Sequence, residues 1–254
     1  MTSLLDLSGK TAVVTGGSRG VGRATALLLA KAGASVGIGY RSRSVEAQET
    51  VEDLEGLGVQ AWAEPGELGS PEGAAALFER ADREFSGLDI FVGNAGIWPP
   101  EDIPISEMSD AHWRRTIQAN LDSIFFTTRE AAKRIRDDGR IVLVSSTAGQ
   151  RGEAYHVDYA ASKGAIISMV KGLCVELGGR GVTVNCVAPG WIDTEMAWPA
   201  YGEGGKDAIA RTIPIGRVPP AEDIAGPIVF LCSELARHIT GEILNVNGGA
   251  VLVG

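Results

Sequence analysis

Cysteine and histidine are scarce in this chain. Three of each occur among 254 residues. The cysteines show neither the close pairs of a zinc site nor the density of a disulfide scaffold, and the histidines are equally scattered. We therefore expect no metal site, and we interpret Cys174, Cys186 and Cys232 as small apolar side chains in a reducing compartment.

An excess of positive charge and long apolar runs are also missing. The chain has 23 Lys and Arg against 32 Asp and Glu, a net charge of -9, whereas proteins held by nucleic-acid phosphates or anionic lipids normally carry basic patches. No stretch approaches the roughly 20 apolar residues that span a bilayer, and Met1 to Gly9 lacks the basic start of a signal peptide. We expect no nucleic-acid partner, no membrane partner and a cytoplasmic location.

No linker rich in proline, serine or charge divides the chain, which indicates a single domain over residues 1–254. Short β-rich runs alternate with helical patterns. This alternation predicts an α/β fold, a doubly wound, Rossmann-like parallel sheet of about seven strands with helices on both faces. The predicted strands are residues 11–15, 35–39, 59–63, 88–92, 140–145, 182–187 and 242–246.

Two helical patterns are clear enough to predict their ends or faces. Ser70-Pro71 has the features of an N-cap followed by a first-turn proline. In the helix expected after residue 22, one apolar face is predicted. Its members are Ala24, Leu27, Leu28 and Ala32.

A glycine-rich loop follows the first predicted strand and precedes that helix. It reads Thr15-Gly16-Gly17-Ser18-Arg19-Gly20-Val21-Gly22. Glycines permit a tight turn, and they let backbone N–H groups approach a pyrophosphate at the positive end of the following helix. The alternative is a loop that only turns the chain.

Tyr159 and Lys163 lie one helical turn apart, with Ser146 upstream. Residues four apart share a helix face, so the Lys163 ammonium is expected to favour the Tyr159 phenolate and to lower the pKa of the phenol, with a hydrogen bond from Ser146. The pattern predicts a proton-transfer site; the alternative is a surface pair on an amphipathic helix. Tyr155 is a second tyrosine nearby, but it has no lysine four residues later.

These motifs together resemble the short-chain dehydrogenase/reductase family, and within it the 3-oxoacyl-[acyl-carrier-protein] reductases. The match runs from Lys10 to Gly249. The glycine loop, Asn94 and Ser146 each follow a predicted strand, so all would meet at the carboxyl edge of the sheet. The matching family motifs are the loop at residues 15–22, Asn94-Ala95-Gly96, Asn120, Ser146, Tyr159 with Lys163, and Pro189-Gly190 with Thr194.

The resemblance implies hydride transfer between a nicotinamide and a carbonyl or carbinol carbon. Tyr159 would give or take the proton, Lys163 would bond the nicotinamide ribose, and Ser146 would orient the carbonyl. Asn120 would hold a water that links Lys163 to solvent. The structural alternatives are that Ser146 only ends a strand and that Asn120 packs within its helix.

The choice of cofactor follows from charge. Sites that prefer NAD usually carry an acid at the end of the second strand, where this chain has Tyr40 and then Arg41. Together with Arg19, Arg41 would suit a 2′-phosphate, so the sequence predicts NADP(H) in preference to NAD(H); Arg43 we interpret as surface charge. Glu67 stands where the family often has an Asp near the adenine. The expected cofactor-binding residues are Gly16, Ser18, Arg19, Gly20, Val21, Gly22, Arg41, Glu67, Leu68, Asn94, Ala95, Gly96, Tyr159, Lys163, Pro189, Gly190, Ile192 and Thr194.

The substrate site is expected beside the catalytic residues, under a lid of about residues 190–212. Trp198 and Tyr201 are further candidates to line it, although the tryptophans would equally suit lid packing or a subunit contact. The expected substrate-binding residues are Ser146, Gln150, His156, Tyr159, Trp98 and Trp191.

Three functions remain open on the sequence. The first is an NADP(H)-dependent oxidoreductase of ketones and secondary alcohols, similar to 3-oxoacyl reductases. The second is a dehydrogenase of a sugar, polyol or other small alcohol. Val175, where carrier-protein reductases often have an arginine, weakens the argument for a carrier partner. The alternatives for the basic run of Arg129, Lys133, Arg134 and Arg136 are a local patch that docks a carrier and a solvated helix face. The third is a nucleotide-binding protein without catalysis. The resemblance also implies a homotetramer, built through helices near residues 107–136 and 155–178 and through the C-terminal segment.

Overall fold

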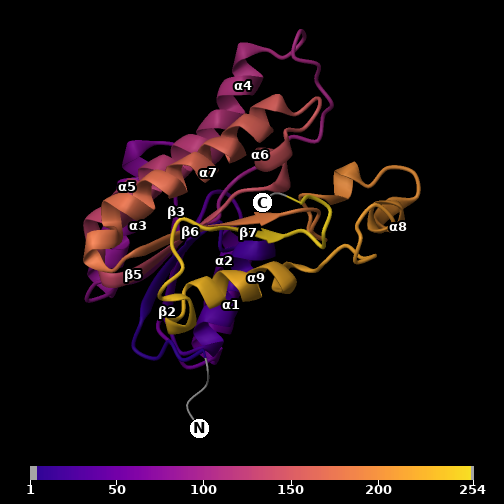
Figure 1. The fold of residues 1–254 in the computed structure, drawn as a ribbon. Coiled ribbons are helices and arrows are strands. Elements are labelled where there is room, and N and C mark those ends of the chain that lie inside the picture. Colours follow the sequence, from indigo (N-terminus) through magenta and orange to yellow (C-terminus); the bar gives the residue numbers. More distant parts are fainter. Residues whose placement is uncertain (1–4, 253–254) are drawn as a thin grey trace.

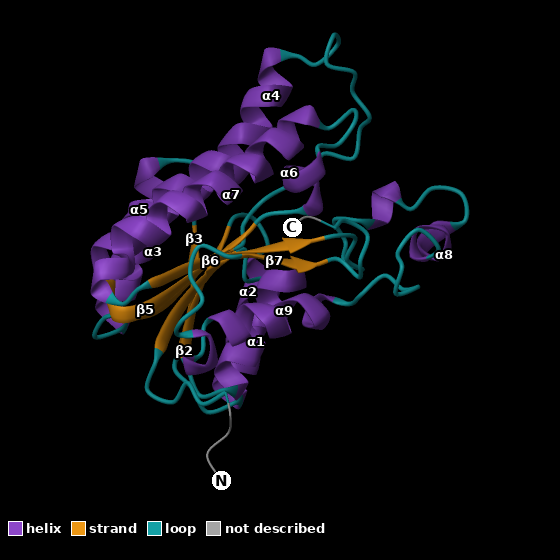
Figure 2. Ribbon diagram, in the orientation of Figure 1, coloured by secondary structure: helices purple, strands orange, loops and turns teal. Residues whose placement is uncertain are grey.

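A computed structural model describes residues 5–252. Over that range the chain forms a seven-stranded parallel sheet in the order β3-β2-β1-β4-β5-β6-β7, with helices on both faces (Figure 1, Figure 2). The predicted doubly wound fold is therefore confirmed. The strands are β1 (Thr11–Thr15), β2 (Ser35–Tyr40), β3 (Ala61–Pro65), β4 (Leu88–Gly93), β5 (Ile135–Val144), β6 (Thr183–Pro189) and β7 (Ile243–Val246).

The predicted strands agree with the structure to within two residues at each end, except at the start of β5. β3 begins two residues later than predicted, and β5 begins at Ile135 rather than at residue 140. The first part of β5 contains Asp137, Asp138 and Gly139, a polar run that has the composition of a turn. Its pairing with β4 is irregular between Leu88 and Ile90, so this part of the strand lacks the apolar pattern on which the prediction depended.

Helices cover the sheet as two layers. Figure 1 shows α3, α5 and α7 along one face and α1, α2 and α9 along the other, while α8 lies beyond the arrowhead of β7. A short π-helical segment (Gln118–Asp122) joins α4 to α5. The helices are α1 (Gly20–Lys31), α2 (Ser44–Gly56), α3 (Pro71–Glu84), α4 (Asp110–Ile117), α5 (Ser123–Arg134), α6 (Thr147–Arg151), α7 (Val157–Leu177), α8 (Gly205–Ala210) and α9 (Ala221–Leu231).

Of the two helix patterns predicted from the sequence, the N-cap of α3 agrees fully with the structure and the apolar face of α1 agrees in part. The Ser70 hydroxyl accepts a hydrogen bond from Gly73 N at 3.1 Å, and Pro71 opens α3, so this N-cap is confirmed. The predicted apolar face of α1 contacts the core, since Ala24 is buried and Leu27, Leu28 and Ala32 pack against it while partly exposed. The face is incomplete, because Ala26, Leu29 and Ala30 are also buried. α1 packs between the sheet, α2 and α9, and a helix with three neighbours has no single apolar stripe.

Two hydrophobic cores hold the layers together, one on each side of the sheet. Leu29, Ile38 and Ile228 belong to the first, while Phe78 and Phe91, with ring centroids 5.6 Å apart, belong to the second. Strands buried on both faces leave only their ends open to solvent. In a doubly wound sheet the crevice lies at the carboxyl ends of the strands, so that edge is where a site is expected. Among the helices described, none combines the length and apolarity required to cross a membrane.

Candidate active site

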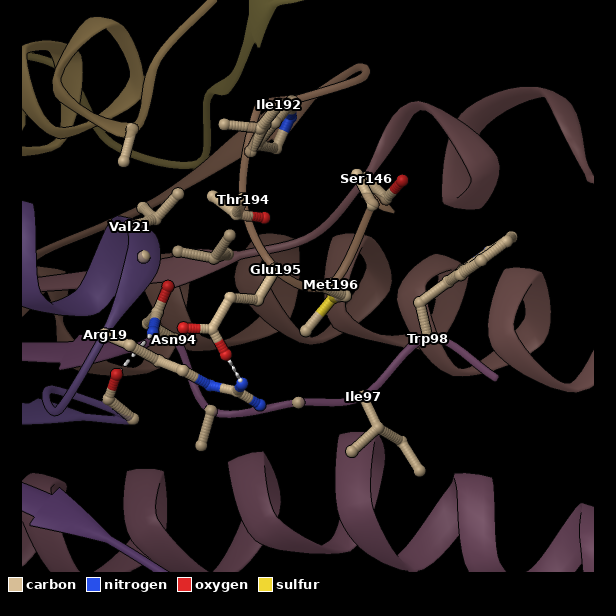
Figure 3. Close-up of a pocket in the computed structure, with 18 of the residues that line it drawn as sticks. Arg19, Val21, Asn94, Ile97, Trp98, Ser146, Ile192, Thr194, Glu195 and Met196 are labelled. Carbon is tan, nitrogen blue, oxygen red and sulfur yellow. Dashed lines mark hydrogen bonds and ion pairs between the residues drawn. The ribbon is translucent and has the colours of Figure 1, made fainter. Parts of the chain in front are cut away.

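A cleft of about 790 Å³ opens at the carboxyl edge of the sheet (Figure 3). The loops after β1, β2, β4, β5 and β6 contribute to it. Most residues expected in the site line this cleft: Gly16, Ser18, Arg19, Gly20, Val21, Arg41, Glu67, Leu68, Asn94, Ala95, Gly96, Trp98, Ser146, Tyr159, Lys163, Pro189, Gly190, Trp191, Ile192 and Thr194. The cleft lining does not include Gly22, Asn120, Gln150 or His156.

The glycine loop is shaped by backbone constraints that only glycine satisfies. Gly16 has a φ of +67°, and a Cβ on Gly22 would lie 2.2 Å from the Gly16 carbonyl oxygen, closer than any real contact. Gly22 therefore lets α1 pack against the loop from behind the cleft. No side chain caps the first N–H groups of α1, which leaves a helix N-terminus suited to an anion beside the loop.

Asn94 ties the end of β4 to the end of β1. Its backbone N–H donates to Thr15 Oγ1 at 2.9 Å, and its side-chain amide donates to the Thr15 carbonyl at 3.0 Å. Ala95 N also donates to Thr15 Oγ1, at 3.0 Å. These bonds hold the Asn94-Ala95-Gly96 segment against the glycine loop on one wall of the cleft.

Asn120 lies beneath that wall, fully buried in the π-helical segment. Its amide donates to the Ile97 carbonyl at 2.9 Å and to Ser162 Oγ at 3.2 Å, while its oxygen accepts from Ile97 N at 2.7 Å. A Cβ on Gly96 would lie 3.0 Å from Asn120 Oδ1 and 3.4 Å from Lys163 Nζ. Asn120 therefore positions the Gly96–Ile97 backbone directly against Lys163.

Ser146, Tyr159 and Lys163 meet at the end of β5. Lys163 is 5% exposed, and its Nζ donates to the Val144 carbonyl at 2.9 Å. The same Nζ lies 5.9 Å from the centroid of the Tyr159 ring. The Ser146 hydroxyl caps α6 by accepting from Ala148 N at 3.1 Å. The structure thus brings the three residues together, as the sequence predicted.

Burial dominates the protonation of both central groups. It raises the pKa of Tyr159 to about 12, against the lowering effect of a hydrogen bond with Ser146, while the Glu153 carboxylate raises this pKa further. Burial also lowers the pKa of Lys163 to about 8. The expected lowering of the Tyr159 pKa was therefore wrong for this arrangement, because both groups are desolvated and Lys163 donates to Val144.

One end of the cleft holds three arginines and an unexpected acid. Glu195 Oε2 lies 2.5 Å from Arg19 Nη1, the pair joined by a dashed line in Figure 3, and 3.3 Å from Arg43 Nη2. Arg41 lies 3.6 Å from Glu67. Arg43 is 47% exposed, in line with its interpretation as surface charge, and it also lines the cleft. The sequence signal for placing Arg43 at the cleft is its position three residues after β2. The corresponding signal for Glu195 is its position directly after Thr194, which was expected to bind the cofactor.

Aromatic side chains form the other end. Trp98 stacks on His156 with ring centroids 4.7 Å apart and meets the edge of Trp191 at 6.2 Å. Both tryptophans line the cleft, whereas His156 is buried behind Trp98. The Gln150 amide donates to Asn245 Oδ1 at 2.6 Å, away from the cleft lining. The prediction that His156 and Gln150 line the substrate site therefore needs correction, because each is held by a neighbour.

The family-model scan matches residues 16–251 to a model described as enoyl-(acyl carrier protein) reductase. The chain is 38% identical to a 3-oxoacyl-[acyl-carrier-protein] reductase of Vibrio cholerae, with 98% of this chain and 100% of the relative covered. The chain belongs to the short-chain dehydrogenase/reductase family. It is therefore an oxidoreductase of that family.

Two solved structures show the same fold for members of the family. A dehydrogenase/reductase from Sinorhizobium meliloti has a TM-score of 0.92 and 36% identity, with 99% of each chain covered. A short-chain dehydrogenase from Burkholderia cenocepacia, solved in complex with NADP, has a TM-score of 0.90 and 36% identity, with 96% of this chain and 98% of that chain covered.

In this short-chain dehydrogenase/reductase, the segment after β6 is tied together by Asp193. Its carboxylate accepts from Tyr201 Oη at 2.9 Å and Trp198 Nε1 at 3.3 Å, and pairs with Lys206. Tyr201 and Trp198 are thus used in the internal packing of this segment, and Trp198 also lines the cleft. Tyr155 is 53% exposed and is not part of the cleft lining, which favours Tyr159 as the functional tyrosine.

Proposed function

We propose that this protein is an NADP(H)-dependent ketoreductase that interconverts a ketone and a secondary alcohol. The observation that carries the proposal is one continuous cleft that holds Tyr159, Ser146 and Lys163 together with the glycine loop and arginines. The relatives named as 3-oxoacyl reductases and the neighbour solved with NADP support it.

The cleft fits a dinucleotide at both of its ends. The glycine loop and the N-terminus of α1 would hold the pyrophosphate, because Gly16 and Gly22 leave no room for side chains and α1 has no side-chain cap. Arg19 and Arg41 would hold the adenosine ribose and its phosphate. Lys163 and Asn94 would hold the nicotinamide riboside. When bound, the reduced cofactor supplies the hydride.

The remaining chemistry is assigned to protein groups. Tyr159, with a pKa of about 12, is protonated near neutrality and would donate its proton to the carbonyl oxygen during reduction. Ser146, which hydrogen-bonds Tyr159, would orient that oxygen. Asn120 would act by holding the Gly96–Ile97 backbone beside Lys163. A water relay from Asn120 to solvent stays a prediction.

NADP(H) is proposed in preference to NAD(H) because the cleft offers guanidinium groups where a 2′-phosphate would lie. Arg19, Arg41 and Arg43 all line it. Their present partners, Glu195, Glu67 and Glu46, are between about a third and a half exposed, so these ion pairs are weak in water. A phosphate dianion would attract the guanidinium groups more strongly than a ribose hydroxyl would.

A small free ketone is the second candidate substrate, and the charges on α5 favour it over a carrier-bound thioester. Glu130 accepts from Lys133 at 2.7 Å and from Arg134 at 2.7 Å, and it lies 3.7 Å from Arg129. Val175 is 80% exposed. Glu130, together with Asp82, which pairs with Arg134 at 2.9 Å, offsets two of the three positive charges on α5, so an acidic carrier would find little free positive charge there.

The proposal is tested by the oxidation of NADPH, with NADH in parallel, in the presence of a substrate panel. The panel contains an acetoacetyl thioester, aryl and cyclic ketones, and keto sugars. Fast turnover of the thioester with NADPH would indicate a 3-oxoacyl reductase, whereas preference for a free ketone would indicate the second candidate. Tight NADPH binding without turnover of any compound would contradict the catalytic proposal.

We also propose that the protein is a homotetramer in the cytoplasm, with α4, α5 and α7 at subunit contacts. Trp113, Phe125 and Val175 on these helices are 40%, 46% and 80% exposed. The Arg129 guanidinium lies over the Phe125 and Phe126 rings at 5.3 and 5.2 Å. Large apolar groups at the surface of one long helical face are typical of a contact between subunits.

A further inference from the structure

Glu195 occupies a position that an external anion would be expected to take. A single carboxylate oxygen, Oε2, lies 2.5 Å from Arg19 and 3.3 Å from Arg43. Arg43 also donates to Glu46 at 2.7 Å, so it is held by two acids. Two guanidinium groups that converge on one oxygen form the arrangement that proteins use to bind phosphate.

The position of Glu195 is set by the segment that follows β6. Thr194 lies beside the glycine loop, since a Cβ built on Gly20 would be 3.5 Å from Thr194 Cγ2. Thr194 N donates to the Ile192 carbonyl and Ala197 N to the Thr194 carbonyl, both at 2.9 Å. Figure 3 shows the Glu195 side chain extending from this segment toward Arg19 across the cleft.

We propose that Glu195 is an internal competitor for the 2′-phosphate subsite and so determines how strongly the protein discriminates NADP(H) from NAD(H). The inference rests on the proposed use of NADP(H). The carboxylate neutralises Arg19 and Arg43 when no phosphate is bound, and a 2′-phosphate must displace it to reach them. A cofactor without that phosphate leaves the ion pairs in place.

The competition between the Glu195 carboxylate and a 2′-phosphate should change ligand affinity by a predictable amount. The Glu195 and Arg19 side chains are 43% and 45% exposed, so solvent screens their attraction and the carboxylate is displaced at modest cost. Removal of its charge should tighten the binding of 2′-phosphorylated ligands by about threefold to tenfold. Ligands without the phosphate should bind as before.

Binding of two adenosine fragments tests this without any hydride chemistry. Isothermal titration calorimetry would measure the Kd of adenosine 2′,5′-bisphosphate and of adenosine 5′-monophosphate for wild type and Glu195→Gln. We expect the bisphosphate alone to bind more tightly to the variant, with the difference shrinking at high salt. Glu203→Gln, an exposed glutamate of the same segment, is the matched control and should change neither Kd.

An unchanged or weaker bisphosphate Kd in Glu195→Gln would overturn the inference. Weaker binding of the monophosphate would overturn it as well, because Glu195 would then be a ribose ligand. The variant Arg43→Gln distinguishes failure of the Glu195 proposal from failure of the proposed use of NADP(H). If that variant loses bisphosphate affinity, NADP(H) use stands whatever Glu195 does. If wild type, Glu195→Gln and Arg43→Gln all bind the two fragments equally, both proposals fail.

Discussion

Tyr159 is a half-buried phenol whose proton is retained near neutrality, since desolvation raises its pKa to about 12. We predict that Tyr159→Phe lowers the turnover number by at least about a hundredfold, because the proton donor is lost while the ring remains. NADPH affinity should stay within about twofold. Steady-state kinetics and a fluorescence titration of NADPH measure the two quantities.

Tyr155→Phe is the control for that substitution. Tyr155 is 53% exposed and is not among the residues lining the cleft, so turnover should remain close to that of wild type. Near-normal turnover of Tyr159→Phe would contradict the assignment of the proton donor.

Lys163 is a buried ammonium, and its pKa is lowered from 10.5 to about 8. The folded state therefore releases this proton more readily than the unfolded state does. The resulting cost to stability, on the order of 3 kcal/mol, is fully present below about pH 8 and disappears as the pH rises from about 8 to 10.5.

We predict that Lys163→Met changes the pH dependence of stability in a defined direction. The unfolding free energy of wild type, relative to the variant, should rise between about pH 8 and pH 10.5. Urea unfolding at several pH values measures it. Lys171→Met, at an exposed position of the same helix, should show no such trend, and a flat difference for Lys163→Met would rule out the effect.

At the scale of elements, the join between β1 and α1 depends on close backbone contact. A Cβ on Gly22 would lie 2.2 Å from the Gly16 carbonyl oxygen, and backbone cannot yield as a side chain can. We predict that Gly22→Ala weakens NADPH binding at least about tenfold and destabilises the fold by about 1–3 kcal/mol. Calorimetric titration and thermal unfolding measure these effects.

Gly56→Ala provides the comparison in another helix. Gly56 closes α2, and a Cβ there would meet no atom within 4 Å. That substitution should leave NADPH affinity unchanged and stabilise the helix slightly through the higher helix propensity of alanine. Equal effects of the two substitutions on cofactor binding would contradict the close-contact argument.

At the scale of the whole molecule, exposed apolar groups on α5 and α7 should determine assembly. We predict that Phe125→Asp combined with Val175→Asp converts a tetramer into smaller species, because charges would be buried at the contact. Light scattering after size-exclusion chromatography measures the mass, and circular dichroism verifies the fold. Leu57→Asp is the control, because Leu57 directly follows α2 and is 41% exposed; this variant should keep the wild-type mass. If the double variant is still a tetramer, the proposed contact is contradicted.

The parts of the site that the sequence predicted are those with local physical causes. Strand and helix periods predicted the sheet, and the order of strand, glycines and helix predicted the loop of Gly16 to Gly22. The spacing of Tyr159 and Lys163 placed both side chains on one helix face. The start of β5 could not be predicted in this way, because residues 136–139 are polar and lack the apolar pattern of a strand, although the strand pairs with β4 from Ile135.

The fold, the family and the convergence of Ser146, Tyr159 and Lys163 could be predicted from the amino-acid sequence, because these follow from periodicity and from motifs within short stretches. The partners of Glu195, which lies 176 residues from Arg19 in the chain, and the contact of Gln150 with Asn245 became visible in the folded chain alone. Tertiary structure also sets the pKa of Tyr159, since burial depends on which segments enclose the phenol. Long-range contacts and desolvation belong to the folded chain, and no local pattern encodes them.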